Sequence, residues 1–144
     1  MAFHGTFEHT LDAKHRLTVP SKFRAALEGR AFLVKGVDRC VSVYPEQTYS
    51  AMTQAALSGL NPFSPEAREL RRFFNANAED VELDSAGRVM LPRTHLEHAG
   101  IDRQVVILGA GDSLELWDRE TWKAYDTDLT ARAPDLTAAL GHPS

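Results

Sequence analysis

Apolar and polar side chains alternate between residues 5 and 11, which is the pattern of a β-strand with one buried face. Residues 12–15 predict a turn, because an Asp at the first position of a turn can accept hydrogen bonds from nearby backbone N–H groups. Alternation resumes over residues 16–19, where Leu17 and Val19 should face the core. The chain is therefore expected to open with a strand, a tight turn and a second strand.

A helix and a hairpin should follow this opening unit. Pro20 has no N–H for a strand ladder but suits the first turn of a helix, and Gly29 is a residue that ends helices. In order, the sequence predicts a helix over residues 21–27, a hairpin of residues 32–34 and 41–44, a helix over 45–57, a helix-breaking linker over 58–62 and a helix over 64–74.

The opening pattern occurs twice in the chain. Residues 11–20 read Leu-Asp-Ala-Lys-His-Arg-Leu-Thr-Val-Pro, and residues 83–92 read Leu-Asp-Ser-Ala-Gly-Arg-Val-Met-Leu-Pro. The likeness continues in residues 40–44 and 113–117, which alternate and end on an aromatic residue. Two copies that share strand pattern, turn and aromatic endpoint indicate an internal duplication.

The second copy should repeat the elements of the first. It predicts strands over residues 81–83 and 88–91, a helix from Pro92 to Gly100, a hairpin of 105–108 and 114–117, and a helix from Asp118 to about Leu129 followed by a frayed end. Neither half is large enough to bury its sheet alone, so we expect a mostly β protein with capping helices (α+β) whose halves interlock into one closed barrel. The expected parts are a first repeat (5–47), linker helices (48–76), a second repeat (77–120) and a C-terminal helix and tail (121–144).

Composition narrows the class of protein. No apolar run approaches the roughly 18 residues that a membrane span needs, and the start of the chain has no export signal, so a cytoplasmic protein is expected. The single cysteine, Cys40, excludes an intramolecular disulfide and should be buried as a small apolar residue.

Charge is unevenly distributed although the formal net charge is −4. Cationic residues outnumber acidic ones in residues 1–30, and the balance reverses after Trp117. The cations of the first segment are Lys14, Arg16, Lys22, Arg24 and Arg30. This asymmetry is compatible with an oriented polyanionic partner, but charge alone leaves the question open.

The paired Asp-x-x-x-Arg motifs, the Gly5-Thr6-Phe7 start and the Leu116-Trp117-Asp118 ending resemble the MraZ family over roughly residues 3–125. This resemblance implies a bacterial transcriptional regulator of the division and cell wall gene cluster, associated with the nucleoid. It also implies tandem AbrB-like repeats in a swapped-hairpin, double-split β-barrel, assembly into a closed homo-oligomeric ring, and binding to repeated short DNA boxes upstream of its own operon.

The repeated turn supplies the candidate DNA-binding residues. A turn at the tip of a ribbon that carries Lys14, His15 and Arg16 offers hydrogen-bond donors to phosphate oxygens and, through arginine, to a guanine edge. The second copy keeps Arg88 but has no lysine, so the first copy should carry more of the affinity. The resemblance adds Arg24 to these contacts.

A purely structural interpretation of these residues stays open. Asp12 and Asp84 could each pair with the arginine that follows and pin the turn, although an Asp can also orient an Arg toward a second partner. Arg24 could lie on a solvated helix face.

The two turns differ at the residue before the arginine. Gly87 occupies this position in the second copy and His15 in the first. If the turn requires a positive φ, glycine adopts it freely and histidine is among the few other residues found there. His15 also adds a ring that should bind phosphate better when protonated.

The sequence gives little support for a metal site, a dinucleotide site or a catalytic site. His95 and His98, with Glu97 between them, could be half of a metal site, but surface polarity is the preferred interpretation. Gly109-Ala110-Gly111 predicts a hairpin turn rather than a dinucleotide loop. Serine-elbow, Walker and paired-cysteine motifs are missing, so no enzyme activity, cofactor, metal or small-molecule substrate is expected.

A second class of function is an oligomeric protein-interaction module, antitoxin-like or a scaffold, without direct DNA readout. In that case the arginines of the turns are structural, and the acidic tail or the linker helix holds a partner. Phe73-Phe74 beside Arg71-Arg72 is a candidate subunit contact.

Overall fold

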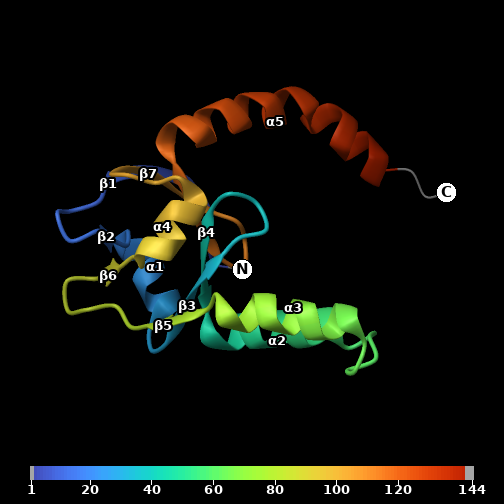
Figure 1. Ribbon diagram of the computed structural model, residues 1–144. Helices are drawn as coiled ribbons and strands as arrows, with labels where there is room; N and C mark the ends of the chain where they lie inside the picture. The colour runs from blue at the N-terminus through green and yellow to red at the C-terminus, as the bar shows by residue number, and fades with distance from the viewer. Residues whose placement is uncertain (1, 142–144) are drawn as a thin grey trace.

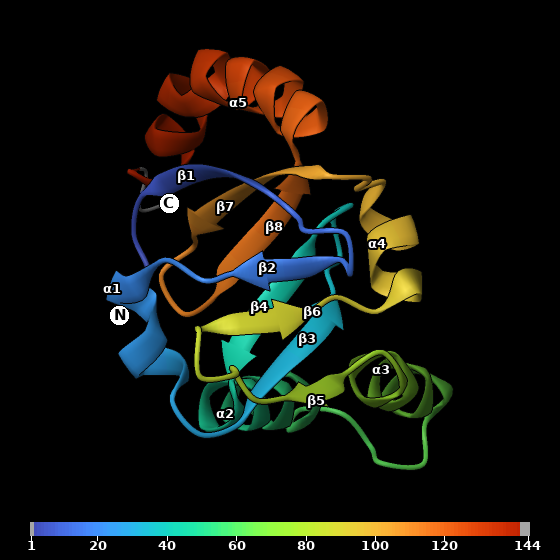
Figure 2. The ribbon, with the colours of Figure 1, turned by 90° about the vertical axis from the view of Figure 1, so that its left-hand side faces the viewer.

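In the computed structural model, which describes residues 2–141, eight strands form a six-stranded sheet and a separate two-stranded ribbon (Figures 1 and 2). The sheet has the order β1-β7-β8-β4-β3-β5, and the ribbon pairs β2 with β6. All neighbouring strands are antiparallel. The strands are β1 (Thr6–Thr10), β2 (Arg16–Thr18), β3 (Ala31–Lys35), β4 (Val41–Pro45), β5 (Glu79–Val81), β6 (Arg88–Met90), β7 (Gln104–Gly109) and β8 (Leu114–Asp118).

The two copies exchange strands. The first strand of each copy pairs with the other copy, so that β1 lies beside β7 and β5 lies beside β3. The pairs β2–β6 and β4–β8 also join the copies. This confirms that the halves interlock and that the sequence duplication is a structural one.

The sheet is open, which differs from the closed barrel that the sequence predicts. Within residues 2–141, β1 and β5 are the two edges of the six-stranded sheet. The β2–β6 ribbon pairs with neither edge and instead lies across one face of the sheet (Figure 2). Three-residue strands are too short to bridge both edges, so side-chain packing rather than hydrogen bonding joins ribbon to sheet.

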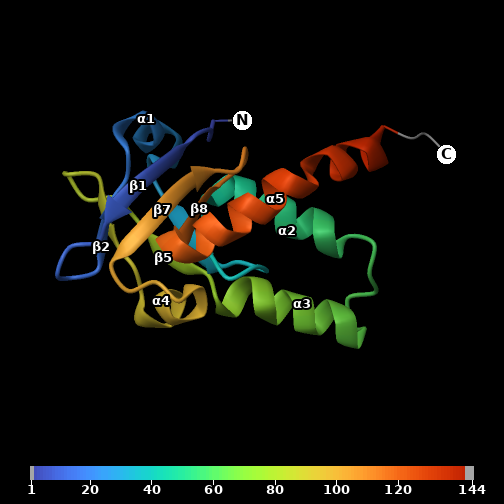
Figure 3. The same cartoon turned by 90° about the horizontal axis from the view of Figure 1, so that it is seen from above.

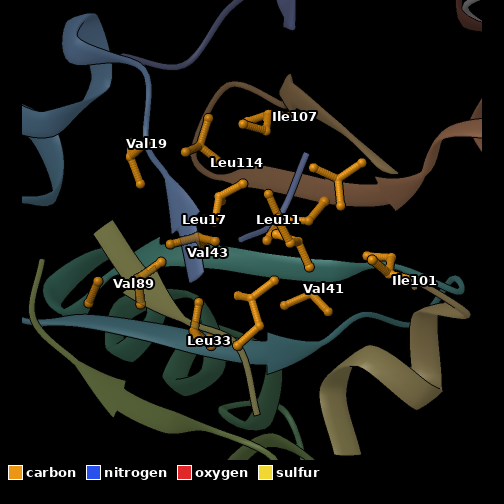
Figure 4. Packing of buried hydrophobic residues seen from close by; sticks show 14 of the residues in the cluster. Leu11, Leu17, Val19, Leu33, Val41, Val43, Val89, Ile101, Ile107 and Leu114 are labelled. Carbon is orange, nitrogen blue, oxygen red and sulfur yellow. The ribbon is translucent and has the colours of Figure 1, made fainter. Parts of the chain in front are cut away.

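The main core lies between ribbon and sheet. Leu17 of β2 and Val89 of β6 point toward Leu33, Val43 and their neighbours on β3 and β4 (Figure 4). Leu17 and Val19 are fully buried, as their alternation predicted. Burying one such side chain contributes about 1.5–3 kcal/mol, so this packing fixes how the ribbon sits on the sheet.

A second apolar cluster is formed by Cys40, Val106, Leu108 and Trp117. The Trp117 ring stacks on Tyr125 of α5 with the ring centroids 5.2 Å apart. Cys40 is buried as expected, and burial raises the pKa of its thiol to about 12. This thiol is therefore an apolar packing group rather than a nucleophile.

The helices flank the sheet. They are α1 (Ser21–Arg24) with a 3₁₀ turn (Ala25–Leu27), α2 (Glu46–Leu57), α3 (Pro65–Ala76), α4 (Arg93–Ala99) and α5 (Arg119–Leu140). Helix α3 starts where the Ser64 side chain accepts a hydrogen bond from Ala67 N, and α4 ends at Gly100, whose φ is 65°. The Tyr49 hydroxyl donates to Phe74 O at 2.6 Å and ties α2 to α3.

Helix α5 is longer than predicted. It continues through Pro134 to Leu140, so the prediction of a frayed end after Leu129 is wrong for residues 130–140. Residues 142–144 lie outside the described part of the chain. Alanine-rich sequence on both sides of Pro134 favours helix, and the helix is curved (Figure 1). Figure 3 shows α5 crossing over β7 and β8 and continuing beyond the sheet, where every residue from Thr130 to Leu140 is exposed. None of the helices within residues 2–141 is long and apolar enough to cross a bilayer.

Candidate nucleic-acid interface

The two repeated turns project from the same side of the molecule, away from α2, α3 and the end of α5 (Figure 1). In each turn one carboxylate oxygen of the Asp organises the backbone. Asp12 Oδ1 accepts hydrogen bonds from the N–H groups of Lys14 and Arg16, both at 2.9 Å. Asp84 Oδ1 accepts from Ala86 and Arg88 at the same distance. The repeated aspartate therefore builds the same turn twice.

The other carboxylate oxygen holds the arginine. Asp12 Oδ2 lies 2.7 Å from Arg16 Nε, and Asp84 Oδ2 lies 2.9 Å from Arg88 Nε. The arginine side chains are 28% and 35% exposed. Only Nε is used in each pair, and within residues 2–141 the Nη groups of Arg16 and Arg88 make no hydrogen bond. Each arginine is thus oriented by its Asp while its planar end remains available.

These contacts keep both carboxylates ionised. The N–H of Arg16 is the largest cause that lowers the pKa of Asp12, from 3.8 to about 2, with further contributions from the Arg16 side chain and the Lys14 N–H. The pKa of Asp84 is also lowered, chiefly by the N–H of Arg88. A lowered pKa means that each turn is most stable when its Asp carries charge.

The residue before each arginine has a left-handed backbone. The φ angle is 58° at His15 and 75° at Gly87. The turn therefore does require a positive φ, and His15 adopts it while remaining exposed. The two residues also join the copies, because His15 O accepts from Leu91 N and Gly87 O accepts from Val19 N.

Arg24 lies across the second turn, although it belongs to the first copy. Its Nε donates to Val19 O at 2.9 Å, and a side chain at Gly87 would collide with its guanidinium. Arg24 is only partly exposed, so its surroundings differ from those of a solvated helix face. This arrangement brings a cation to a turn whose own sequence has only Arg88.

The ribbon presents four side chains outward. Strand pairing places Arg16 opposite Met90, Leu17 opposite Val89, and Thr18 opposite Arg88. Because alternate residues of a strand point to opposite faces, the buried middle pair leaves the other two pairs on the outer face. Arg16, Arg88 and Met90 line one shallow concavity beside the ribbon, together with Asp84, Val89, Pro92 and the β5 segment residues Glu79, Val81 and Glu82.

Sequence reasoning missed Thr18 and Met90 as members of this face. Met90 is 57% exposed. The sequence could have placed Met90 on the same face as Arg88, because the two are two residues apart in one strand. Its position next to Arg16 depends on pairing between the copies, which neither copy shows alone.

The two histidines of α4 are structural. His95 is only 4% exposed, so the expected surface polarity is wrong for this residue. His95 Nε2 lies 2.8 Å from Asn77 O and 3.1 Å from Leu33 O, and His98 Nε2 lies 2.9 Å from Gly36 O. A ring nitrogen that faces a carbonyl oxygen must carry its proton and donate. These rings tie α4 to β3 and to the loop after it, and residues 2–141 contain no group of three or more potential metal-ligating side chains.

The Gly109-Ala110-Gly111 segment joins β7 to β8, as predicted for a hairpin turn. Phe3 pairs with Gly111 through two backbone hydrogen bonds, and a side chain at Gly109 would collide with the backbone of Phe3. Glycine is needed here for close approach of the N-terminal segment rather than for ligand binding.

A family model described as "MraZ protein, putative antitoxin-like" matches the chain in two segments, residues 2–73 and 74–139. A protein of Lactiplantibacillus plantarum named "Transcriptional regulator MraZ" is 41% identical over 138 residues, covering 96% of this chain and 97% of the relative. Proteins of the same name from Thermomicrobium roseum and Symbiobacterium thermophilum are 36% and 38% identical, covering 96% and 95% of this chain and 96% and 99% of those relatives. With both halves matched by the family model and nearly the whole chain aligned to these relatives, the chain belongs to the MraZ family.

Proposed function

We propose that this chain is a DNA-binding transcriptional regulator that reads DNA with the outer face of its β2–β6 ribbon and the two flanking turns. The name of its relatives, "Transcriptional regulator MraZ", supports a role in transcription. The observation that carries the proposal is that Arg16 and Arg88 lie on one outward face, each oriented by an Asp through Nε. An arginine held in this way can make a bidentate contact with a guanine edge.

The ribbon has suitable dimensions for the major groove, which admits a two-stranded β-ribbon. Arg16 and Arg88 lie diagonally across it, because Arg88 is opposite Thr18 and Arg16 is two residues away on the same strand. Strand geometry gives a Cα separation of about 8 Å, and successive base pairs are about 3.4 Å apart. The two guanidinium groups therefore fit bases about two steps apart.

The remaining cations have supporting roles in this proposal. Lys14 and His15 lie exposed at the tip of the first turn, where they would contact phosphate oxygens. Arg24 would act at the second turn, beside Gly87. Asp12, Asp84 and Gly87 set the shape of the turns rather than contacting DNA.

Assembly would compensate for the small number of cations on one ribbon. With a net charge of −4, a single subunit has few favourable phosphate contacts, and several ribbons acting together would add their affinities. The proposed assembly is a closed homo-oligomeric ring bound to repeated boxes upstream of its own division and cell wall operon, at the nucleoid. The strand exchange between the copies supports the swapped-hairpin part of the proposed architecture.

A mobility-shift assay with DNA from upstream of its own gene tests this function. Wild type should bind with an affinity that falls with log salt at a slope of about −0.9 per neutralised phosphate. Arg16→Ala should weaken binding by about 5- to 150-fold, the equivalent of 1–3 kcal/mol. The matched control is Arg132→Ala, because Arg132 forms an Arg–Asp pair of the same spacing in α5, with Nε 2.7 Å from Asp128 Oδ2, and the C-terminal end of α5 lies away from the turns (Figure 1). Equal binding by wild type and Arg16→Ala would contradict the proposal.

The alternative, an oligomeric protein-interaction module, is supported by apolar residues on the other side of the molecule. Phe63, which is 84% exposed, precedes α3, and Met52, Leu70 and Phe73 are partly exposed on α2 and α3. These helices extend away from the turns (Figure 1). Subunit contacts through this side would leave the ribbon accessible, so assembly and DNA binding are compatible. DNA binding unchanged in Arg16→Ala would favour the interaction module alone.

A further inference from the structure

The two arginines of the ribbon have unlike neighbours. Thr18 and Met90 occupy equivalent positions in the two copies, two residues after Arg16 and Arg88 respectively. Because the copies pair antiparallel, Met90 lies opposite Arg16 and Thr18 lies opposite Arg88. The outer face thus has two ends that match in their arginine and differ in the residue beside it.

Met90 is a positioned apolar group rather than a loose surface side chain. It is 57% exposed, and its backbone is held in the ribbon by pairing with Arg16 and by the next residue, Leu91, whose N–H donates to His15 O at 3.0 Å. It also lines the concavity shared by the two arginines. An apolar side chain held beside a guanidinium at one end of the face would suit a partner surface that is polar except for a single apolar group.

The major groove offers such a surface. Its base edges present hydrogen-bond donors and acceptors, and its apolar feature is the C5-methyl group of thymine. A thioether side chain is polarizable and adapts to such a contact. Thr18, with a hydroxyl and one methyl, can instead form a hydrogen bond to a base edge or to water.

We propose that Met90 contacts a thymine methyl next to the base pair bound by Arg16, and that the difference between Met90 and Thr18 sets the direction in which the ribbon lies on its DNA. This inference rests on the proposed DNA-binding function and adds its specificity. The Nη groups of Arg16 and Arg88, which make no hydrogen bond within residues 2–141, favour DNA over an apolar protein segment. Such a segment would bury the Nη groups of Arg16 and Arg88 without partners, which is costly, whereas base edges and phosphates satisfy them.

The test removes the methyl group from the DNA. A duplex is first selected by wild type from a random pool, and its thymines are then replaced by uracil. Wild type should lose about fourfold in affinity for each contacted methyl, the effect of one buried CH₂. Met90→Ala should bind the thymine and uracil duplexes equally, and Met90→Leu should keep the discrimination. Val37→Ala is the control, because Val37 is an apolar residue that is 90% exposed in the β3–β4 turn.

The outcomes separate this inference from the function on which it rests. If wild type enriches no duplex, or if Arg16→Ala binds as well as wild type, the DNA-binding function fails and the inference fails with it. If Arg16→Ala loses binding but wild type ignores the methyl group, or Met90→Ala still senses it, only the inference is overturned. Selection with Met90→Thr should return the guanines and lose the thymine, and a retained thymine would contradict the assignment. Thermal melting checks that each variant is folded.

Discussion

The first turn (residues 12–16) and the second turn (84–88) have the same geometry but different charge. In both, an Asp accepts two N–H hydrogen bonds at 2.9 Å and holds the Nε of an arginine. Between Asp and Arg the first turn carries Lys14 and His15, whereas the second has only small, uncharged residues. The two copies therefore share the residues that shape the backbone of the turn and differ in the charge of the residues between them.

The first copy also supplies a cation to the second turn. Arg24 extends from α1 over Gly87, and its counterpart in the second copy is Leu96, which is buried. The two turns are thus supported asymmetrically. Variants of the two turns should therefore differ in DNA affinity and in stability.

The largest expected effect is the loss of DNA binding on removal of an arginine. Arg16→Ala and Arg88→Ala should each cost about 1–3 kcal/mol of binding free energy, as for an arginine that contacts a base. Arg16→Ala should cost more, because Lys14 and His15 depend on the same turn for their position. Fluorescence anisotropy with one duplex at fixed salt measures both. A greater loss for Arg88→Ala would reverse the assignment of the first turn as the stronger contact.

Substitution at the position before the arginine should separate the turns in stability. Gly87→Ala places a side chain at φ 75° against Arg24 and should destabilise the fold by about 1–3 kcal/mol. His15→Ala changes one non-glycine residue for another at φ 58° and should have an effect within about 0.5 kcal/mol. Urea unfolding followed by circular dichroism measures the free energies. Similar values for the two variants would show that neither the positive φ nor the contact with Arg24 makes a side chain at position 87 costly.

The turns and the strands on either side of them could be predicted from the sequence because their determinants are local, whereas the ribbon could not, because β2 pairs with β6 of the other copy and not with the strand before its own turn. Asp12 and Asp84 act on N–H groups two and four residues away, and strand alternation placed Leu17 and Val19 in the core. The repeat then indicated that the halves interlock, since neither could bury its sheet alone.

The features that were not predicted depend on contacts between distant segments. His95 is buried because carbonyl groups of Leu33 and Asn77 meet its ring, and nothing near it in sequence indicates this. The position of Arg24 over Gly87 and of Met90 beside Arg16 follows from pairing between copies. The open edges of the sheet likewise depend on how the ribbon packs, which no local pattern encodes.

The side chain at the tip of the first turn should distinguish the turns by a smaller factor. His15 is exposed there, and its ring can donate a hydrogen bond to a phosphate oxygen. His15→Gly should therefore weaken DNA binding a few-fold, while the glycine keeps the left-handed backbone of the turn. The measurement is an anisotropy titration at constant pH and ionic strength. Equal affinities would remove His15 from the contact surface.

Acid stability should give the smallest difference between the turns. The pKa of Asp12 is lowered in the folded state, to about 2 from 3.8, so its charged form adds stability that is present above about pH 4 and is lost as the pH falls toward 2. Asp12→Asn should therefore lower the urea midpoint at neutral pH and flatten its decline over that interval. The pKa of Asp84 is lowered as well, so Asp84→Asn should act in the same direction. Because both carboxylates lie at the surface, where water screens charge, the decline between pH 4 and 2 should be shallow. If Asp12→Asn declines as steeply as wild type over this interval, the carboxylate does not hold the turn, and the shared geometry of the two turns would have to come from the backbone alone.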